Sequence, residues 1–405
     1  MKTAHRAVAV LAAAAIIPLG LVACSSGSGG ASTAKSITLE DYFTDGSHDA
    51  QYAKCEASTG IKVNAVHVAG ASLIQKVLQQ VSSKTLPDVL MIDNPDVQQI
   101  AATGALAPLK DFGITGDGLT PAAVKAGTYK GQLYGAQPLA NSIALFYNTD
   151  ILQAAGVQPP KTWDELRTAA RQLTDASKGR YGFAMSNINT YEGTWQFLPF
   201  FWSNGGDEKN IATPQAAQAL QFVLDLQNDG SLSKSSISWA QADVNNQFIA
   251  GKAAMMINGP WQIPALAKAS GLHWASVSVP VREASQTSVA PLGGEQYTLP
   301  QTGKKDAQAA GAKFVQCLMS PAMQSFEAKT AQTVPTDLAE AKKFGAANPD
   351  VASFVGVVAD ARARTAELGE GWPKAATKIY TAVQLALTGK ASPADALKQA
   401  RSENQ

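Results

Sequence analysis

Short apolar runs along the chain alternate with segments in which apolar residues recur at helical spacing. Residues 37–43, 61–68 and 89–92 are apolar or alternate in polarity, which predicts strands. Residues 46–58 and 72–83 lie between them and have the spacing of helices. Strands that alternate with helices indicate a parallel sheet covered on both faces. The chain is therefore predicted to have an α/β fold.

A further apolar run, residues 253–257, has the length and character of a buried parallel strand. Asn258-Gly259-Pro260 ends it as a turn, and Trp261 follows directly. In open α/β sheets, ligands bind beyond the carboxyl ends of the strands. We therefore expect the indole of Trp261 to face a ligand. The alternative is a tryptophan that only covers the core.

The N-terminus has the pattern of an export signal. Lys2 and Arg6 precede a mostly apolar stretch, residues 7–21. The Leu-Val-Ala-Cys tetrapeptide that ends at Cys24 resembles the bacterial lipobox, which implies cleavage after residue 23 and a lipid on the Cys24 thiol. An ordinary or uncleaved signal with a chance cysteine is the alternative. Residues 24–36 are rich in Gly and Ser and predict a flexible tether.

Length and charge narrow the class of protein. A chain of 405 residues is too long for one ordinary core and predicts two domains. The formal net charge is +1, and the loss of Lys2 and Arg6 with the signal would make it −1. A chain without a basic surplus is not expected to bind nucleic acid.

Motifs for catalysis or cofactor binding are missing from the sequence. It contains no G-x-S-x-G, H-E-x-x-H, C-x-x-C or Walker-type motif, and His48, His67 and His273 are widely scattered. We predict no metal, no cofactor and no enzymatic activity. Two carboxylate pairs could in principle serve a glycosidase, but solvated loop acids are the alternative, which we favour for Asp96. These pairs are Asp41 with Asp45 and Asp93 with Asp96.

Five segments together resemble the extracellular solute-binding proteins of ABC importers, in the carbohydrate-binding group that includes maltose-binding protein. They are the N-G-P-W turn at 258–261, the Y-N-x-D strand end within 134–150, the P-x-T-W-D-E-L motif within 159–166, the aromatic helix before N-G-G within 190–207, and the Gly-rich strand entry within 290–299. The G-x-x-S-P-x-x-A-L pattern at 389–397 is also similar to the end of these proteins. Apart from the leader and tether, the resemblance covers nearly the whole chain.

The resemblance implies a two-lobed periplasmic-binding-protein-like fold of type II, with the ligand cleft between the lobes. Lobe one is expected to comprise residues 37–140 with 294–340, and lobe two residues 141–293 with 341–405. Cys55 and Cys317 both fall in lobe one, so a disulfide between them is possible, and two buried free thiols are the alternative.

The expected ligand site combines aromatic and polar residues. Aromatic faces would cover the apolar faces of sugar rings, while polar groups would bind hydroxyls. Trp372 would be equally expected as a core residue. The candidate residues are Trp261, Trp195, Trp372, Tyr191, Glu192, Asp45, Asp93, Asn94, Asn141, Gly294 and Glu295.

The function that this resemblance implies is the capture of a carbohydrate, a di- or oligosaccharide, outside the cytoplasmic membrane. The partners would be the sugar and the transmembrane subunits of an ABC permease, and a lipid anchor alone would hold the monomer at the membrane. A polyamine or other small solute in the same fold is one alternative. A secreted carbohydrate-active enzyme and an adhesion lipoprotein are two others.

Overall fold

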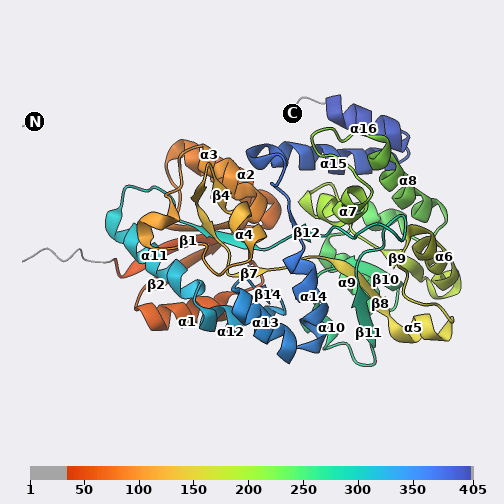
Figure 1. Cartoon of the computed structure of the whole chain (residues 1–405), viewed down its shortest axis with the longest axis horizontal. Helices are drawn as coiled ribbons and strands as arrows, with labels where there is room; N and C mark the ends of the chain where they lie inside the picture. The colour runs from red at the N-terminus through yellow and green to blue at the C-terminus, as the bar shows by residue number, and fades with distance from the viewer. Residues whose placement is uncertain (1–33, 403–405) are drawn as a thin grey trace, which may run out of the picture. The chain divides into compact units, whose positions relative to one another are not determined.

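Two β-sheets organise the part of the chain that the structure describes (Figure 1). This computed structural model describes residues 34–402, which belong to one compact unit. We call the portion around the five-stranded sheet the first lobe and the portion around the four-stranded sheet the second lobe. The predicted signal and Cys24 lie outside the described residues.

The sheet of the first lobe has the strand order β2-β1-β3-β13-β6. β1 pairs in parallel with both β2 and β3, whereas β13 is antiparallel to β3 and to β6. The three strands expected at the start of the chain are thus confirmed, within a few residues at each end. The strands are β1 (Ser36–Asp41), β2 (Lys62–His67), β3 (Val89–Asp93), β6 (Gly135–Ala136) and β13 (Glu295–Thr298).

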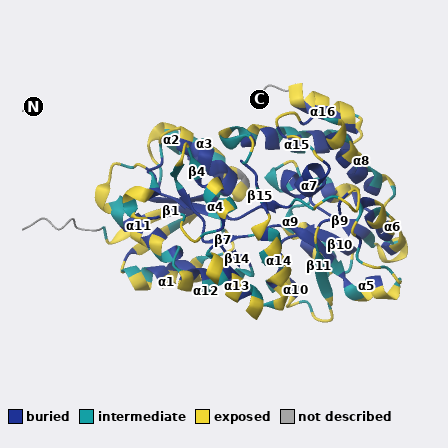
Figure 2. Cartoon of the chain, viewed as in Figure 1, coloured by how far each residue is buried: buried dark blue, intermediate teal, exposed yellow. Residues whose placement is uncertain are grey.

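Helices cover both faces of this sheet. Val89 and Met91 of β3 point into one hydrophobic cluster, whereas Leu90 and Ile92 point into another, as alternation along a strand requires. Figure 2 shows the resulting buried interior and the exposed outer sides of the helices. The helices of this lobe are α1 (Asp49–Thr59), α2 (Gly70–Ser83), α3 (Val97–Ala102), α4 (Pro121–Ala126), α11 (Lys305–Leu318) and α12 (Pro321–Ala331).

The sheet of the second lobe has the order β11-β8-β10-β9. The predicted strand before Trp261 is confirmed as β10, in which every residue is buried. Its strands are β8 (Ala144–Asn148), β9 (Tyr181–Ala184), β10 (Ala253–Asn258) and β11 (Trp274–Val277). Its helices are α5 (Thr149–Ala154), α6 (Trp163–Leu173), α7 (Tyr191–Ser203), α8 (Pro214–Asn228), α9 (Gln241–Ile249), α10 (Ile263–Leu266), α15 (Trp372–Leu387) and α16 (Pro393–Ser402).

Two short strand pairs and two helices lie between these lobes, and a third strand pair, a β-hairpin, belongs to the first lobe. One hydrophobic cluster combines Leu139, Phe146 and Met256 with Phe354 of α14, so it draws on both lobes. The helices are α13 (Leu338–Ala347) and α14 (Pro349–Ala359). The strand pairs are β7 (Leu139–Ala140) with β14 (Val334–Pro335), β12 (Pro291–Leu292) with β15 (Arg362–Ala363), and the β4 (Thr128–Tyr129) and β5 (Gln132–Leu133) hairpin.

The chain passes between the lobes three times, and the three crossings bond to one another. Asn141 and Gly293 exchange two backbone hydrogen bonds, with N···O distances of 3.1 and 2.9 Å. The third crossing joins them where the Arg362 N–H donates to the Ala290 carbonyl at 2.9 Å. The exact lobe boundaries inferred from the sequence stay a prediction.

A disulfide links Cys55 of α1 to Cys317 of α11, with the Cα atoms 5.8 Å apart. Of the two alternatives that the sequence left open, the structure therefore has the disulfide. The bond joins two helices of the first lobe that are 262 residues apart in the sequence.

Candidate functional site

Three polar side chains meet where the strands of the first sheet end. Tyr42 follows β1, Asp93 ends β3, and Glu295 begins the antiparallel β13 directly opposite Asp93. The Tyr42 hydroxyl donates to Glu295 Oε1 at 2.7 Å. Burial, followed by the charge of Asp93, raises the pKa of Glu295 against the opposing effect of the Tyr42 hydrogen bond. The sequence prediction placed Asp93 and Glu295 but missed Tyr42.

Arg364 connects this group to the second lobe. Its guanidinium forms an ion pair with both carboxylate oxygens of Asp93 and donates to Asn94 Oδ1 at 3.1 Å. The same guanidinium lies over the ring of Trp195 in α7, 4.7 Å from the ring centroid. The face of Trp195 on that side is therefore already covered by protein. Sequence reasoning missed Arg364, which lies in an irregular segment without a recognisable motif.

Trp261 lies in a single turn of 3₁₀-helix, η5 (Pro260–Gln262), immediately after β10. The indole is half-buried. It packs directly against Gly259, where an added Cβ would lie 1.9 Å from the ring. Only glycine at 259 permits this approach, so the turn fixes the position of the indole at the carboxyl end of the strand, as predicted.

Tyr191 and Glu192 form the first turn of α7, which Thr190 caps through a hydrogen bond to the Glu192 N–H. Glu192 Oε2 in turn accepts from the Gln241 N–H at 2.7 Å, at the start of α9. One carboxylate oxygen of Glu192 thus has a structural role. Burial, followed by the charge of Asp96, raises the pKa of Tyr191.

Asp96 was expected to be a solvated loop acid, and this expectation is wrong. It ends the 3₁₀-helix η1 (Asn94–Asp96) and is only 5% exposed. Its Oδ1 has no hydrogen-bond partner. Burial, followed by the negative charge of Asp93, raises the pKa of Asp96 to about 8, with Arg364 opposing the shift. Because Pro95 lies in the first turn of a short helix that begins at Asn94, the chain folds inward instead of continuing as an exposed loop.

Asn141 and Gly294 belong to the crossing segments. Asn141 pairs with Gly293, as described above. Gly294 has a φ of +120°, and a Cβ there would lie 2.3 Å from Gln137 Nε2 and 2.4 Å from the Leu139 carbonyl. The close neighbours of Gly294 in the structure are thus Gln137 and Leu139, and its role as a ligand residue stays a prediction.

Trp372 and Asp45, two predicted site residues, differ in their surroundings. Trp372 is 1% exposed and its ring packs against Trp202 at 6.1 Å, which fits the core alternative for this residue. Asp45 is exposed and accepts from the Ser47 N–H within its own loop. Trp372 shares a hydrophobic cluster with Trp195, and Trp261 packs against that cluster.

The carboxylate pairs considered for a glycosidase are already engaged. Asp41 is fully buried, accepts from the Tyr52 hydroxyl at 2.8 Å, and contacts His67 Nδ1 at 2.6 Å. Asp93 is occupied by Arg364. Neither pair therefore offers two carboxylates that are free to act on one glycosidic bond.

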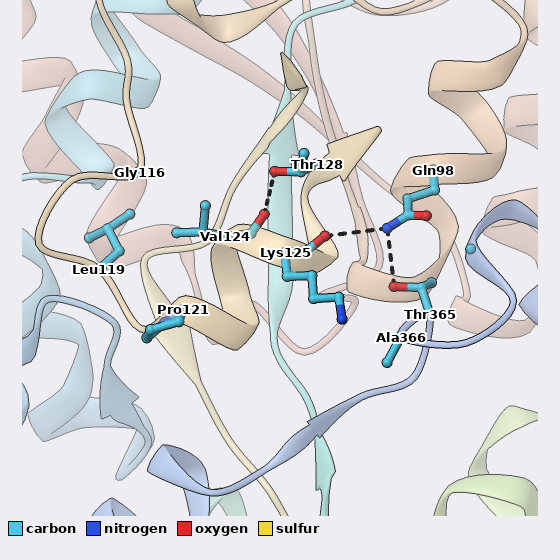
Figure 3. Close-up of a pocket in the computed structure, with 10 residues that line it drawn as sticks. Gln98, Gly116, Leu119, Pro121, Val124, Lys125, Thr128, Thr365 and Ala366 are labelled. Carbon is cyan, nitrogen blue, oxygen red and sulfur yellow. Dashed lines mark hydrogen bonds between the residues drawn. The ribbon is translucent and has the colours of Figure 1, made fainter. Parts of the chain in front are cut away.

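A cavity of about 600 Å³ lies beside α4 (Figure 3). Gln98 at its edge donates to the Lys125 carbonyl at 3.3 Å and to the Thr365 hydroxyl at 3.2 Å. This amide holds the segment that follows Arg364 against the first lobe. None of the predicted ligand residues is among the residues that line this cavity.

Within residues 34–402, no group of three or more His, Cys, Asp or Glu side chains is arranged to hold a metal ion. None of the helices in this part of the chain has the length and apolar character needed for a membrane crossing.

Residues 50–353, about three quarters of the chain, match the family described as bacterial extracellular solute-binding protein. The chain belongs to this family. Members of the family bind solutes and are components of transport systems, so this protein is a binding protein and not an enzyme.

Known relatives of this solute-binding protein, and solved structures similar to it, have the same fold. A maltooligosaccharide ABC transporter solute-binding lipoprotein of Streptococcus pneumoniae is 26% identical over 366 residues, which cover 85% of this chain and 84% of the relative. The GacH receptor of Streptomyces glaucescens, solved unliganded and with acarbose, has a TM-score of 0.80 at 25% identity, covering 91% of this chain and 96% of that one. Maltose-bound MalE3 of T. maritima has a TM-score of 0.81 at 24% identity, covering 90% and 97%. The two-lobed α/β fold is thereby confirmed.

Proposed function

We propose that this solute-binding protein captures a carbohydrate, a di- or oligosaccharide, and delivers it to the permease of an ABC importer. The observation that carries the proposal is the half-buried indole of Trp261, fixed by Gly259 at the carboxyl end of β10. Such a flat apolar surface suits the C–H face of a sugar ring. The maltooligosaccharide-binding relative supports the same ligand class.

Polar residues from both lobes would bind the hydroxyls. Glu295, Asp93 and Asn94 belong to the first lobe, and Tyr191 and Glu192 to the second. A ligand that contacts both sets gains its full interaction energy only when the lobes are close together. Binding would therefore shift the population toward the closed state, which the permease would recognise.

Thermal unfolding of the purified protein with a panel of mono-, di- and oligosaccharides tests the proposal, with spermidine as a further probe. A ligand at a thousandfold excess over its Kd would stabilise the protein by about 4 kcal/mol. A shift with one sugar class supports the proposal. A shift with spermidine alone would favour a polyamine-binding protein instead.

Trp261→Ala provides the site-directed test. This substitution should weaken binding of the sugar found in the panel by at least about tenfold, since it removes the stacking surface. Trp274→Ala is the matched control, because Trp274 is also a half-buried tryptophan of the second lobe and packs on Phe146. Equal binding by wild type and Trp261→Ala would contradict the assignment of Trp261.

We further propose that the protein is an exported monomer, anchored to the outer face of the cytoplasmic membrane by a lipid on Cys24. The lipobox-like sequence and the lipoprotein relative support this location. Cys24→Ala should move the protein from the membrane fraction to the soluble exported fraction. Light scattering of the released protein should give the mass of one chain.

A further inference from the structure

Three buried polar atoms near η1 have no hydrogen-bond partner: Asp96 Oδ1, Trp195 Nε1 and Arg364 Nε. Their residues are 5%, 6% and 4% exposed. They belong to one neighbourhood, because Arg364 lies over the Trp195 ring and donates to Asn94, which is in the same 3₁₀ turn as Asp96. Buried polar groups are normally paired. One acceptor and two donors in the same place therefore indicate a group that is supplied from outside the chain.

Helix capping does not explain the position of Asp96. This residue precedes α3 at the position from which an aspartate usually accepts a backbone N–H, yet its side chain accepts none. Asp93, three residues earlier, does accept the Asn94 N–H in this way. The Asp96 carboxyl is thus buried without the usual structural compensation.

The carboxyls around Asp96 are compensated unequally. The positive charge of Arg364 is matched by Asp93 through both carboxylate oxygens. Glu295, opposite Asp93, accepts from the Tyr42 hydroxyl and is acted on by the charge of His48, which pairs with Glu327. Asp96 forms no ion pair within residues 34–402, and its Oδ1 accepts no hydrogen bond. Its carboxyl is therefore the one in this group that lacks a counter-charge.

We propose that the ligand is a carbohydrate that carries a protonated amine, and that its ammonium group pairs with Asp96. A neighbouring hydroxyl of the same ligand accepts hydrogen bonds from Trp195 Nε1 and Arg364 Nε. An amine next to a hydroxyl, as in an amino sugar, supplies the missing donor and the missing acceptor together. A neutral sugar leaves Asp96 without a counter-charge, and an acidic sugar brings a further negative charge to it. This inference rests on the proposed function.

Isothermal titration of the purified protein tests the pairing with matched ligands. The probes are a glucosamine trisaccharide, its N-acetylated counterpart, maltotriose, a galacturonic acid trisaccharide and spermidine. The amine trisaccharide should bind more tightly than its N-acetylated counterpart by at least about tenfold, the factor expected from one charge-assisted hydrogen bond. At pH 6 the free Asp96 is protonated, because its pKa is about 8. Binding of an ammonium group should then release about one proton per ligand.

Asp96→Asn keeps the shape of the side chain and removes its charge. It should abolish both the preference for the amine and the proton release. Asp111→Asn is the matched control, because Asp111 is an exposed carboxylate of the same lobe. Equal or tighter binding of the N-acetylated, neutral or acidic sugar would overturn the inference but leave carbohydrate capture standing. An amine preference that persists in Asp96→Asn would overturn it as well. Binding of spermidine without any sugar would overturn both proposals.

Discussion

Removal of the Cys55–Cys317 disulfide should destabilise the protein considerably. The bond closes a loop of 262 residues, which restricts the unfolded chain. The chain-entropy relation gives roughly 5 to 6 kcal/mol at 25 °C for a loop of this length. Measured losses are usually smaller than this relation gives, so we expect the Cys55→Ala/Cys317→Ala double variant to lose about 3 to 5 kcal/mol of unfolding free energy.

Urea unfolding measures this loss. Far-ultraviolet circular dichroism reports on both lobes, whereas all seven tryptophans lie between residues 163 and 372, outside the helices that the disulfide joins. Agreement of the two signals shows whether the lobes unfold together, which the free-energy analysis requires. Sugar binding should be unchanged in the variant, because neither cysteine is among the candidate ligand residues.

Reduced wild type is the control for this experiment. It should unfold at the same urea concentration as the double variant, because both lack the same constraint and differ only at the two sulfur atoms. A loss below about 1 kcal/mol in both proteins would refute the loop-closure argument, because it lies well under the expected range. A loss in the variant alone would show that packing around the buried Cys55, and not the bond, is responsible.

Three further predictions concern stability. Thr162→Ala removes the capping box at the start of α6 and should cost about 1 kcal/mol in urea unfolding, with Thr162→Ser retaining most of it. Gly294→Ala should cost at least about 1–3 kcal/mol because of the positive φ, and more from the contact with the Leu139 carbonyl, so an unchanged melting temperature would contradict the described backbone. The hydrogen bond from Arg167 holds the pKa of Asp229 well below its usual range. The ionised Asp229 therefore stabilises the folded protein at neutral pH, and this stabilisation is lost as the pH falls below about 4. Asp229→Asn should therefore lower stability at pH 7 and flatten its dependence on pH in the acid range, and parallel curves for the two proteins would contradict this.

The regular elements could be predicted because their signals are local. The strand before Trp261 is a continuous apolar run ended by a Gly-Pro turn, and the capping box around Thr162 is written in adjacent residues. Both appear in the structure close to the expected positions. Asp93 follows the apolar run predicted as a strand at 89–92, and Glu295 lies in the Gly-rich strand entry within 290–299, and the structure places both at strand ends.

The remaining site features depend on long-range contacts that no local pattern encodes. Arg364 is 271 residues from Asp93 in the sequence, and Tyr42 is 253 residues from Glu295. The burial of Asp96 follows from the packing of η1 among segments that join both lobes, so a short polar sequence was mistaken for an exposed loop. Trp195 shows the same limit, because its position was expected but the guanidinium over its ring was not.

The backbone hydrogen bonds among the three crossings determine which relative motions of the lobes are easy. A single connecting strand would let the lobes swivel about their common axis. Here, twisting would break the paired hydrogen bonds between Asn141 and Gly293 and the bond from Arg362 to Ala290, at about 1 kcal/mol each. Bending keeps these bonds and changes only the backbone angles beside them. The crossings thus resist twisting but allow bending. The two halves of a binding surface can therefore separate and still return to the same alignment.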